Sequence, residues 1–428
     1  MLDTHFIREN LAAVKDNCKN RNVTADVDRV VTLDDERKRI ISLAQVRQQE
    51  ANASAKSVGG EKDPAKKQEL IARGKQLREE VGAFDAQLKQ VEADLKAVVS
   101  TIPNMTHSAA PIGALPEDNK VVKVWGTPTK FDYKPKDHVA LCETLDLADF
   151  EAGAAVAGQK FYFLKNEAVL LELALIHYAM DTLLKHGYTP IITPDVARVD
   201  VLEGIGFMPR GEGTQIYSIA DSDLCLIATA EITLGGMHRD KIMEEPKLPL
   251  KYVGLSHCFR TEAGAPGRDT RGLYRVHQFT KVEMFAFCTP EQSDAIHEEI
   301  LGIEESIFQG LKLPYHVIDT CTGDLGGPAY RKYDLEAWMP ARGKEGEYGE
   351  VTSTSNCTDF QARRLNIRYK GPNHKGTRFV HTLNGTAVAV SRCLVALLEN
   401  NQQADGTVVI PEVLRQWMGG REVISAKK

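Results

Sequence analysis

Residues 273–288 read Leu-Tyr-Arg-Val-His-Gln-Phe-Thr-Lys-Val-Glu-Met-Phe-Ala-Phe-Cys, which is typical of a β-strand. This stretch is rich in β-formers, and its polar and apolar side chains alternate. Because successive side chains of a strand point to opposite faces, odd-numbered positions share one face and even-numbered positions the other. The odd face carries Leu273, Arg275, His277, Phe279, Lys281 and Glu283, and the even face carries Val276, Val282, Met284 and Ala286. The even face is therefore predicted to pack on the core.

The odd-numbered face has two interpretations. Arg275 and Glu283 each lie four residues from Phe279, and each step spans about 13 Å at the usual strand rise. An aromatic ring between a cation and a carboxylate at this spacing suits an extended nucleotide and an adjoining group. The alternative is a solvated outer face with ordinary cross-strand ion pairs. Alternation alone leaves both interpretations open.

The residues around this strand predict the sheet to which it belongs. Residues 251–259 are also rich in β-formers and end in Phe259-Arg260-Thr261-Glu262. A mobile, basic loop rich in Gly and Arg is expected to follow, so the two runs predict a β-hairpin. Helical patterns at 166–186 and 290–311 alternate with such runs. The mixture predicts an α+β domain around an antiparallel sheet flanked by helices.

The N-terminal part of the chain has a seven-residue period instead. Eight apolar residues and one glycine recur with four-three spacing, at Leu70, Gly74, Leu77, Val81, Phe84, Leu88, Val91, Leu95 and Val98. This seam predicts a long helix that packs along one edge. An upstream helix follows the same frame less regularly, through Val27, Val30, Ile41, Ala44, Ala51, Ala55 and Val58, with Asp34, Arg37 and Gln48 at seam positions. Gly59 and Gly60 are expected to end that helix, and Asp63 and Pro64 to begin the next. The two helices are therefore predicted to form a long antiparallel coiled-coil arm over about residues 27–100.

Charge is distributed unevenly along the predicted arm. Residues 37–78 hold eleven Lys or Arg against four acidic residues, although the whole chain carries a net charge of −6. Such a segment could contact the phosphates of a nucleic acid. The alternative is a dimerising or spacer coiled coil with a solvated, charged face.

Several classes of protein are excluded or disfavoured by composition. The longest apolar helical stretch, 168–184, contains Glu172, His177 and Asp181, so no membrane span is predicted. The first ten residues lack the basic-then-apolar order of a signal peptide, which makes the cytoplasm the expected compartment. The eight cysteines include no Cys-x-x-Cys pair, so neither a disulfide framework nor a structural zinc site is expected.

Two further features bear on organisation and chemistry. Five prolines lie between residues 100 and 136, and we expect a linker at 106–135 between an N-terminal domain, 1–105, and a second domain, 136–428. Arg392 lies in an apolar pattern that predicts a helix over 385–400. A buried guanidinium needs an anion, which can be a carboxylate or a phosphate. The chain has no Gly-x-x-x-x-Gly-Lys loop, so nucleotide binding would use another design.

Several segments together resemble the signature motifs of class II aminoacyl-tRNA synthetases, and closely those of the seryl-tRNA synthetase family. The segment Gly187-Tyr188-Thr189-Pro190-Ile191-Ile192-Thr193-Pro194 resembles motif 1, and the hairpin around residues 259–283 resembles motif 2. The likeness extends through Phe161-Tyr162-Phe163-Leu164, Thr229-Ala230-Glu231, Glu350-Val351-Thr352-Ser353 and Asn356-Cys357-Thr358-Asp359-Phe360-Gln361-Ala362-Arg363-Arg364. The later glycines often found in motif 3 are replaced by Ala387 and Ser391, and Thr352 and Thr354 stand where serine or cysteine is frequent.

The resemblance implies a class II antiparallel sheet and a set of site residues. ATP-binding residues would be Arg260, Thr261, Glu262, Arg275, Val276, His277, Gln278, Phe279, Glu350, Val351, Thr352, Ser353 and Arg392. Serine-binding residues would be Thr229, Ala230, Glu231, Arg260, Glu283, Asn384 and Thr386. Catalysis would rest on Arg260, Glu262, Glu350 and Arg392, and Glu350 with Ser353 would hold Mg²⁺.

The resemblance also implies a reaction and partners. The chain would activate serine with ATP to seryl-adenylate and load tRNA(Ser), and also tRNA(Sec). Residues 1–105 would form the tRNA-binding domain with its basic arm, residues 136–428 the catalytic domain, and motif 1 the homodimer contact. Two other hypotheses are a regulatory binding protein that has lost turnover and a ligase that loads a carrier protein. Relatives that load a carrier protein lack the long arm.

Overall fold

The computed structural model describes residues 1–207, 214–263, 271–372 and 374–426. It divides into two units, Met1–Met105 and Thr106–Lys428, which are described separately. Most of the loop expected after Glu262, residues 264–270, lies outside the described residues.

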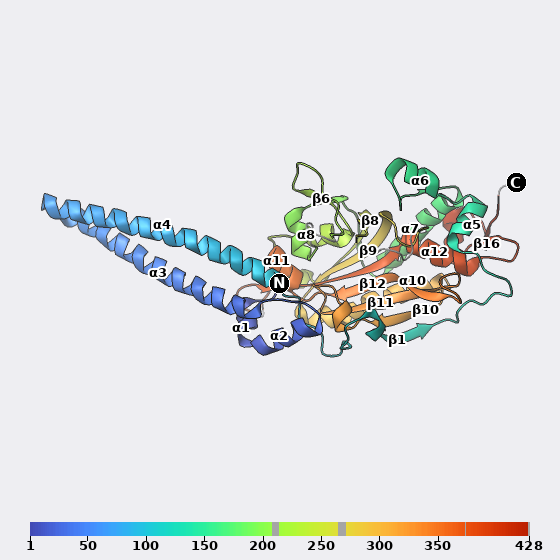
Figure 1. The fold of residues 1–428 in the computed structure, drawn as a ribbon, viewed down its shortest axis with the longest axis horizontal. Coiled ribbons are helices and arrows are strands. Elements are labelled where there is room, and N and C mark those ends of the chain that lie inside the picture. Colours follow the sequence, from blue (N-terminus) through green and yellow to red (C-terminus); the bar gives the residue numbers. More distant parts are fainter. Residues whose placement is uncertain (208–213, 264–270, 373, 427–428) are drawn as a thin grey trace. The chain divides into compact units, whose positions relative to one another are not determined.

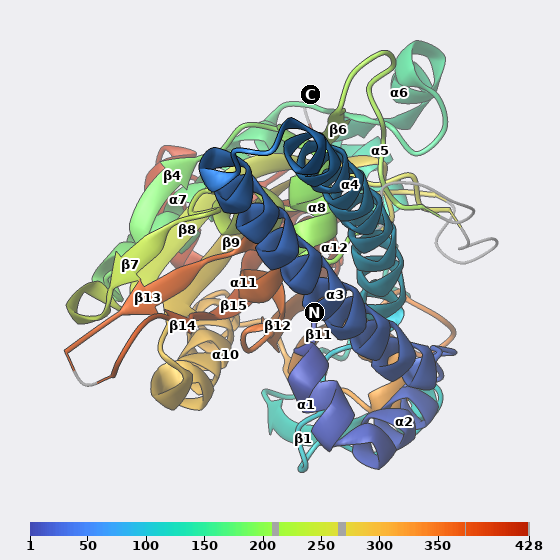
Figure 2. The ribbon, with the colours of Figure 1, turned by 90° about the vertical axis from the view of Figure 1, so that its left-hand side faces the viewer.

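The N-terminal unit is helical throughout its regular structure (Figure 1). Two short helices, α1 (Thr4–Glu9) and α2 (Leu11–Asn20), precede two long ones, α3 (Val27–Gly60) and α4 (Pro64–Thr101). The long helices run antiparallel and side by side in both views (Figures 1 and 2), and Arg47 of α3 pairs with Glu80 of α4 at 3.0 Å. Asp63 caps α4 by accepting a hydrogen bond from the Ala65 amide, with Pro64 at the first position. The predicted helical hairpin is confirmed.

The seam of the hairpin follows the predicted frame with local differences. Leu77, Val91 and Leu95 are buried, as expected, but Val99 is more deeply buried than Val98. On α3, Ile40 and Ser54 are buried, where the sequence predicts Ile41 and Ala55. An α-helix of 3.6 residues per turn drifts against a seven-residue repeat, which moves the buried position by one residue.

Asp34 is one of the polar residues that the frame places at seam positions. Its side chain is buried and pairs with Arg8, Arg37 and Lys38 at 3.0, 2.8 and 2.7 Å. Burial alone would raise the pKa of Asp34, but the hydrogen bonds from Lys38 and Arg8 lower it below its usual value. The buried charge is therefore compensated within the unit.

The second unit is built on an eight-stranded sheet with the strand order β1-β10-β11-β12-β15-β9-β8-β4. The strands are β1 (Lys120–Trp125), β10 (Tyr315–Asp319), β11 (Arg331–Met339), β12 (Glu347–Asn356), β15 (His381–Ala389), β9 (Gln278–Cys288), β8 (Leu250–Phe259) and β4 (Thr189–Ile192). All neighbours pair antiparallel except β4 and β8, which are parallel. The predicted antiparallel α+β architecture is confirmed.

Helices and small sheets surround the large sheet. The helices are α5 (His138–Leu145), α6 (Phe150–Ala157), α7 (Glu167–Lys185), α8 (Val199–Ile205), α9 (Ala230–Gly236), α10 (Ser293–Gly310), α11 (Phe360–Leu365) and α12 (Val390–Asn401). The short strands are β2 (Ala148–Asp149) with β3 (Phe163–Leu164), β5 (Val196–Arg198) with β6 (Leu224–Leu226), β16 (Val408–Val409) with β17 (Val423–Ile424), and the sheet β14 (Arg378–Phe379), β13 (Arg368–Lys370), β7 (Ile242–Glu244).

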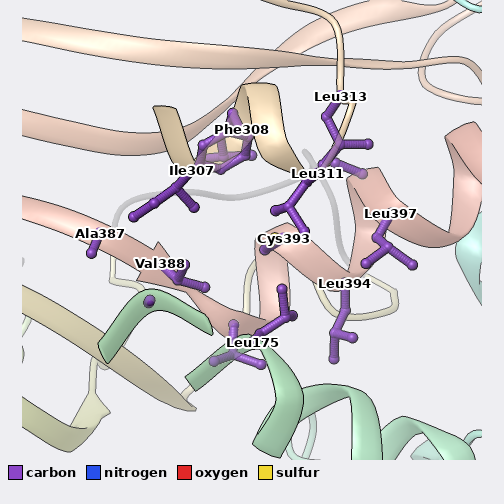
Figure 3. Close-up of a cluster of buried hydrophobic side chains, with 14 of the residues drawn as sticks. Leu175, Ile307, Phe308, Leu311, Leu313, Ala387, Val388, Cys393, Leu394 and Leu397 are labelled. Atoms are coloured by element: carbon purple, nitrogen blue, oxygen red, sulfur yellow. The ribbon is translucent and has the colours of Figure 1, made fainter. Parts of the chain in front are cut away.

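Strand β9 separates two hydrophobic clusters. Its even-numbered residues, Val282, Met284 and Ala286, join the larger cluster, to which α5, α7, α10 and α12 contribute. Figure 3 shows part of this cluster, with Leu175 of α7, Phe308 of α10 and Leu394 of α12. Phe285 and Phe287 point the other way and join a second cluster with α8, α9 and α11. The strand is thus covered on both faces.

Three predicted boundaries differ from the structure. Strand β9 begins at Gln278 rather than near Leu273, because the preceding backbone bonds outside the ladder: Leu273 donates to His138 Nε2 and His277 to the Lys160 carbonyl. Residues 385–389 continue strand β15, paired with β9, so the helix that carries Arg392 begins at Val390. Strand β1, within the expected linker 106–135, pairs with β10 at the sheet edge.

No helix among the described residues is long and apolar enough to cross a membrane.

Candidate active site

One cavity of about 430 Å³ opens on the face of the sheet that carries the odd-numbered residues of β9. Phe279, Lys281 and Glu283 line it from β9, whereas the next odd residues, Phe285 and Phe287, are covered by the second cluster. Alternation alone left open whether this face binds a ligand or is solvated. The structure shows that this part of the strand faces a cavity rather than bulk solvent.

Most of the predicted site residues line this single cavity. They come from five neighbouring segments and comprise Thr229, Glu231, Arg260, Glu262, Arg275, Val276, Phe279, Glu283, Glu350, Val351, Thr352, Ser353, Asn384, Thr386 and Arg392. Four predicted residues do not line it, namely Ala230, Thr261, His277 and Gln278. Ala230 is buried, Thr261 bonds to the Thr214 carbonyl, and His277 lies 2.8 Å from the Arg260 carbonyl. Gln278 lines a separate cavity of about 220 Å³.

A β-bulge in β12 sets the direction of the polar side chains on this strand. The pairing of β12 with β11 skips Val351, since Leu335 faces Thr352 and Glu336 faces Glu350. Strict alternation would put Glu350 and Ser353 on opposite faces. The extra residue shifts the alternation by one, so both side chains line the cavity.

A second bulge lies opposite, in β15. Thr386 pairs with Glu283 and Val388 with Val282, so Ala387 is the extra residue. Asn384 and Thr386 line the cavity before the bulge and Ala389 lines it after. Helix α12 starts directly afterwards, which brings Arg392 to the same cavity.

Five cations line the cavity, and four of them are paired with carboxylates. Arg275 pairs with Glu262 at 2.8 Å, Lys281 with Glu283 at 2.7 Å, Lys332 with Asp334 at 3.0 Å and Arg392 with Glu350 at 3.1 Å. Arg260 has no carboxylate within 4.0 Å among the described residues. Its guanidinium lies 5.4 Å from the Phe279 ring centre, and its Nε donates to the Ala228 carbonyl at 3.4 Å. The charge of Arg260 is thus available to an anionic ligand.

The Arg392 and Glu350 pair joins helix α12 to strand β12. Arg392 also donates to the carbonyls of Glu350 and Tyr274, at 3.1 and 3.4 Å. Burial opposes ionisation of Glu350, but the charges of Arg392 and Lys332 lower its pKa below the usual value. A negative side chain therefore remains beside a cluster of cations.

The opposite end of the cavity is lined by Glu231, Glu283 and neutral polar groups, together with Lys281, which pairs with Glu283. Glu231, near the start of α9, accepts hydrogen bonds from Gln361 at 2.8 Å and Asn384 at 3.1 Å. Burial, and next the nearby Glu283, raise the pKa of Glu231 to about 7. Thr386 donates to Glu283 at 2.9 Å. This end of the cavity offers acceptors for a small, amine-bearing and hydroxyl-bearing ligand.

Sequence reasoning assigned no role to some of the lining residues. Lys281 lies on the odd-numbered face that the alternation identified, so its position could be predicted although its partner could not. Lys332 and Cys357 also line the cavity. No local pattern in the sequence distinguishes Lys332 from other strand lysines.

Comparisons with known proteins agree with this geometry. Residues 1–106 match the family model for the seryl-tRNA synthetase N-terminal domain, and residues 217–401 match the class II core domain of tRNA synthetases for G, H, P, S and T. The chain is 57% identical over 419 residues to the serine-tRNA ligase of Treponema denticola, covering 98% of this chain and 99% of the relative.

Two solved structures are similar over their whole length. The seryl-tRNA synthetase from Pyrococcus horikoshii complexed with ATP has a TM-score of 0.90 at 40% identity, covering 100% of both chains. The cytoplasmic serine-tRNA ligase of Naegleria fowleri in complex with AMP has a TM-score of 0.88 at 33% identity, covering 100% of this chain and 99% of that one. With the hairpin, the class II sheet and the convergence of the site residues on one cavity, these matches show that the chain belongs to the seryl-tRNA synthetase family, the serine-tRNA ligases among class II aminoacyl-tRNA synthetases.

Proposed function

We propose that this chain activates L-serine with ATP to form seryl-adenylate and transfers the seryl group to the 3′ end of tRNA(Ser), and also of tRNA(Sec). The observation that carries the proposal is the convergence of Arg260, Phe279, Glu283 and Arg392 on one cavity. Three of these residues suit the parts of ATP, and Glu283 suits a small alcohol.

The cationic end of the cavity is the proposed ATP site. Arg260 binds the α-phosphate and the serine carboxylate, Phe279 stacks on adenine with Glu262 nearby, and Arg275 and Arg392 bind the terminal phosphates. The free charge of Arg260 supports its role, because a fork of N–H donors matches a phosphate without first leaving a carboxylate.

Positioning and charge stabilisation suffice for the chemical step. A serine carboxylate oxygen attacks the α-phosphorus, the bond to the bridging oxygen breaks, and pyrophosphate leaves with the bonding electrons. No side-chain nucleophile is needed, and the cations stabilise the charge that develops on the phosphoryl oxygens.

Mg²⁺ is proposed to arrive with ATP and to be held by Glu350 and Ser353. Both are oxygen donors, which Mg²⁺ prefers, and the bulge at Val351 places both on the cavity side of β12. When bound, the cation neutralises phosphate charge. The expectation that no structural zinc is needed stays a prediction.

The acidic end is the proposed serine site. Thr229 and Glu231 meet the α-ammonium group, and Glu283 with Thr386 receives the hydroxyl. Alanine is rejected because it leaves these buried polar groups without a partner. Threonine is excluded by space.

The pH dependence of serine activation tests the role of Glu231. Because only its ionised form attracts an ammonium group and its pKa is about 7, kcat/KM for serine should fall about tenfold from pH 8 to pH 6. Pyrophosphate exchange across this range measures it. Glu231→Gln should be less active and show a flat profile, and a flat wild-type profile would contradict the role.

We propose that residues 1–105 form the tRNA-binding domain, with the arm over about 27–100, that 106–135 connect the domains, and that 136–428 are catalytic. The basic half of the arm, together with the match to the N-terminal family model, supports tRNA as the partner.

The buried free cysteines and the polynucleotide substrate support a cytoplasmic location.

A homodimer through motif 1 is also proposed. Its support is the edge strand β4, where Ile192 is 81% exposed, and the exposed Leu173 and Leu184 of α7. Ile192→Asp should therefore convert a dimer into a monomer in sedimentation velocity at micromolar concentration. Ile112→Asp, at a side chain that is 77% exposed elsewhere, is the matched control. If Ile192→Asp and Ile112→Asp sediment with the same molecular mass, this interface is contradicted.

The direct test of the proposed function is ATP–pyrophosphate exchange with each of the twenty amino acids. Exchange with serine alone is expected. Binding of ATP and tRNA without exchange would favour the regulatory hypothesis. Transfer of the activated amino acid to a carrier protein instead of tRNA would favour the third hypothesis.

A further inference from the structure

Lys281 is a buried cation at the serine end of the cavity for which the reaction as proposed gives no role. The residue is 5% exposed and lines the cavity from β9. Its Nζ lies 2.7 Å from Oε2 of Glu283 and 3.4 Å from Oγ1 of Thr386. Thr386 in turn donates to the same Oε2 at 2.9 Å, so the three side chains form a closed triangle.

The triangle leaves a defined part of Glu283 for a ligand. Oε2 accepts from both Lys281 and Thr386, whereas no described residue donates a hydrogen bond to Oε1. Because the Thr386 hydroxyl donates its only proton to Glu283, its oxygen can act only as a hydrogen-bond acceptor toward other groups. A ligand here must therefore donate to the remaining carboxylate oxygen, as an alcohol does and a methyl group does not.

Lys281 is the cation that pairs directly with Glu283, in a region that holds several other carboxyl groups. The carboxyls of Glu231 on α9 and Glu304 on α10 interact electrostatically with Glu283, and Asp334 on β11 interacts with Glu304. The other groups nearby are the Cys258 thiol of β8 and the guanidinium of Arg260. Burial raises the pKa of the fully buried Glu304 well above its usual value. Arg260 is assigned to the substrate anions, which leaves Lys281 as the counterion.

We infer that Lys281 is a positioning residue that sets the specificity for serine, by binding one oxygen of Glu283 so that the other oxygen of the carboxylate faces the substrate hydroxyl. The inference rests on the proposed serine site. It assigns Lys281 an action through Glu283 and no contact with the reacting atoms.

The strand register explains why these three side chains meet. Thr386 of β15 pairs with Glu283 of β9, and Lys281 lies two residues from Glu283, on the same face of the strand. The bulge at Ala387 follows Thr386, so it leaves this pairing unchanged.

The test is pyrophosphate exchange by the full-length chain with Lys281→Met. We expect the KM for serine to rise on the order of 30-fold, with the KM for ATP unchanged, because only the hydroxyl acceptor is disturbed. The ratio of serine to alanine kcat/KM should fall by a similar factor. Lys251→Met is the matched control, since Lys251 on β8 pairs with Glu299 at 2.7 Å and does not line the cavity.

A second variant separates specificity from folding. If Lys281 acts only through Glu283, the double variant Lys281→Met/Glu283→Gln should have the same serine KM as Glu283→Gln, within about twofold. The double variant leaves no unpaired charge, so it carries the test if the single variant does not fold. Losses that add in the double variant would overturn the inference.

Three other outcomes are decisive. A folded Lys281→Met chain with wild-type serine KM and discrimination overturns the role of Lys281 while the proposed function stands. Equal losses for serine and ATP would mark a structural role and also overturn it. A wild-type chain without serine-dependent exchange would instead overturn the proposed function, and the inference with it.

Discussion

Replacing Arg260 with alanine is expected to lower kcat for serine-dependent pyrophosphate exchange by about 10³-fold. Arg260 is the cavity cation without a described carboxylate partner, and the proposed reaction uses it between the α-phosphate and the serine carboxylate. Removing it takes away donors aimed at the phosphoryl group that gains charge as pyrophosphate leaves. Single-turnover formation of the adenylate measures the loss.

The geometry of the guanidinium can be separated from its charge. Arg260→Lys keeps the charge without the fork of donors, so it should recover only part of the rate. Arg378→Ala removes an exposed arginine that pairs with Glu291 at 3.1 Å and should leave kcat unchanged. Thermal unfolding of Arg260→Ala should match the wild type, because no ion pair is lost. A loss of less than tenfold would remove Arg260 from the catalytic step.

Shortening the arm is expected to abolish tRNA charging while serine activation continues. Deletion of residues 51–71 removes its tip, including the exposed Lys56, Lys62, Lys66 and Lys67. The ends can be rejoined by two glycines, since Glu50 and Arg73 face each other across the hairpin at 3.8 Å. We expect kcat/KM for aminoacylation to fall at least about 100-fold, because several phosphate contacts are lost together. Pyrophosphate exchange should change less than twofold.

A charge-only variant tests the same contact without shortening the helices. Changing the four tip lysines to alanine should weaken tRNA binding and make it less dependent on salt. The matched control changes the exposed Lys89 and Lys96, near the opposite end of α4. Equal loss of exchange and aminoacylation after the deletion would contradict the division of labour between the two units.

The elements could largely be predicted because their signals are local. The heptad seam from Leu70 to Leu95 lies within a single helix, so it can be recognised in the sequence without knowing the partner helix. It lies in α4, as predicted. The alternation of β9 identified the face on which Phe279, Lys281 and Glu283 meet the cavity. Prediction failed at residues 385–389, where an apolar run fits a helix or a strand, and pairing with β9 decides for the strand.

The sequence by itself determined the two long helices, the central strands and the family, because periodicity and motifs are properties of contiguous residues. The tertiary structure was needed to show that Glu350 and Ser353 face the same way, that Lys281 and Thr386 converge on one oxygen of Glu283, and that Arg260 has no carboxylate partner among the described residues. The bulges at Val351 and Ala387 depend on pairing with distant strands. A single extra residue in a ladder reverses the direction of every later side chain along the strand. The sequence of the strand alone does not show where that extra residue lies.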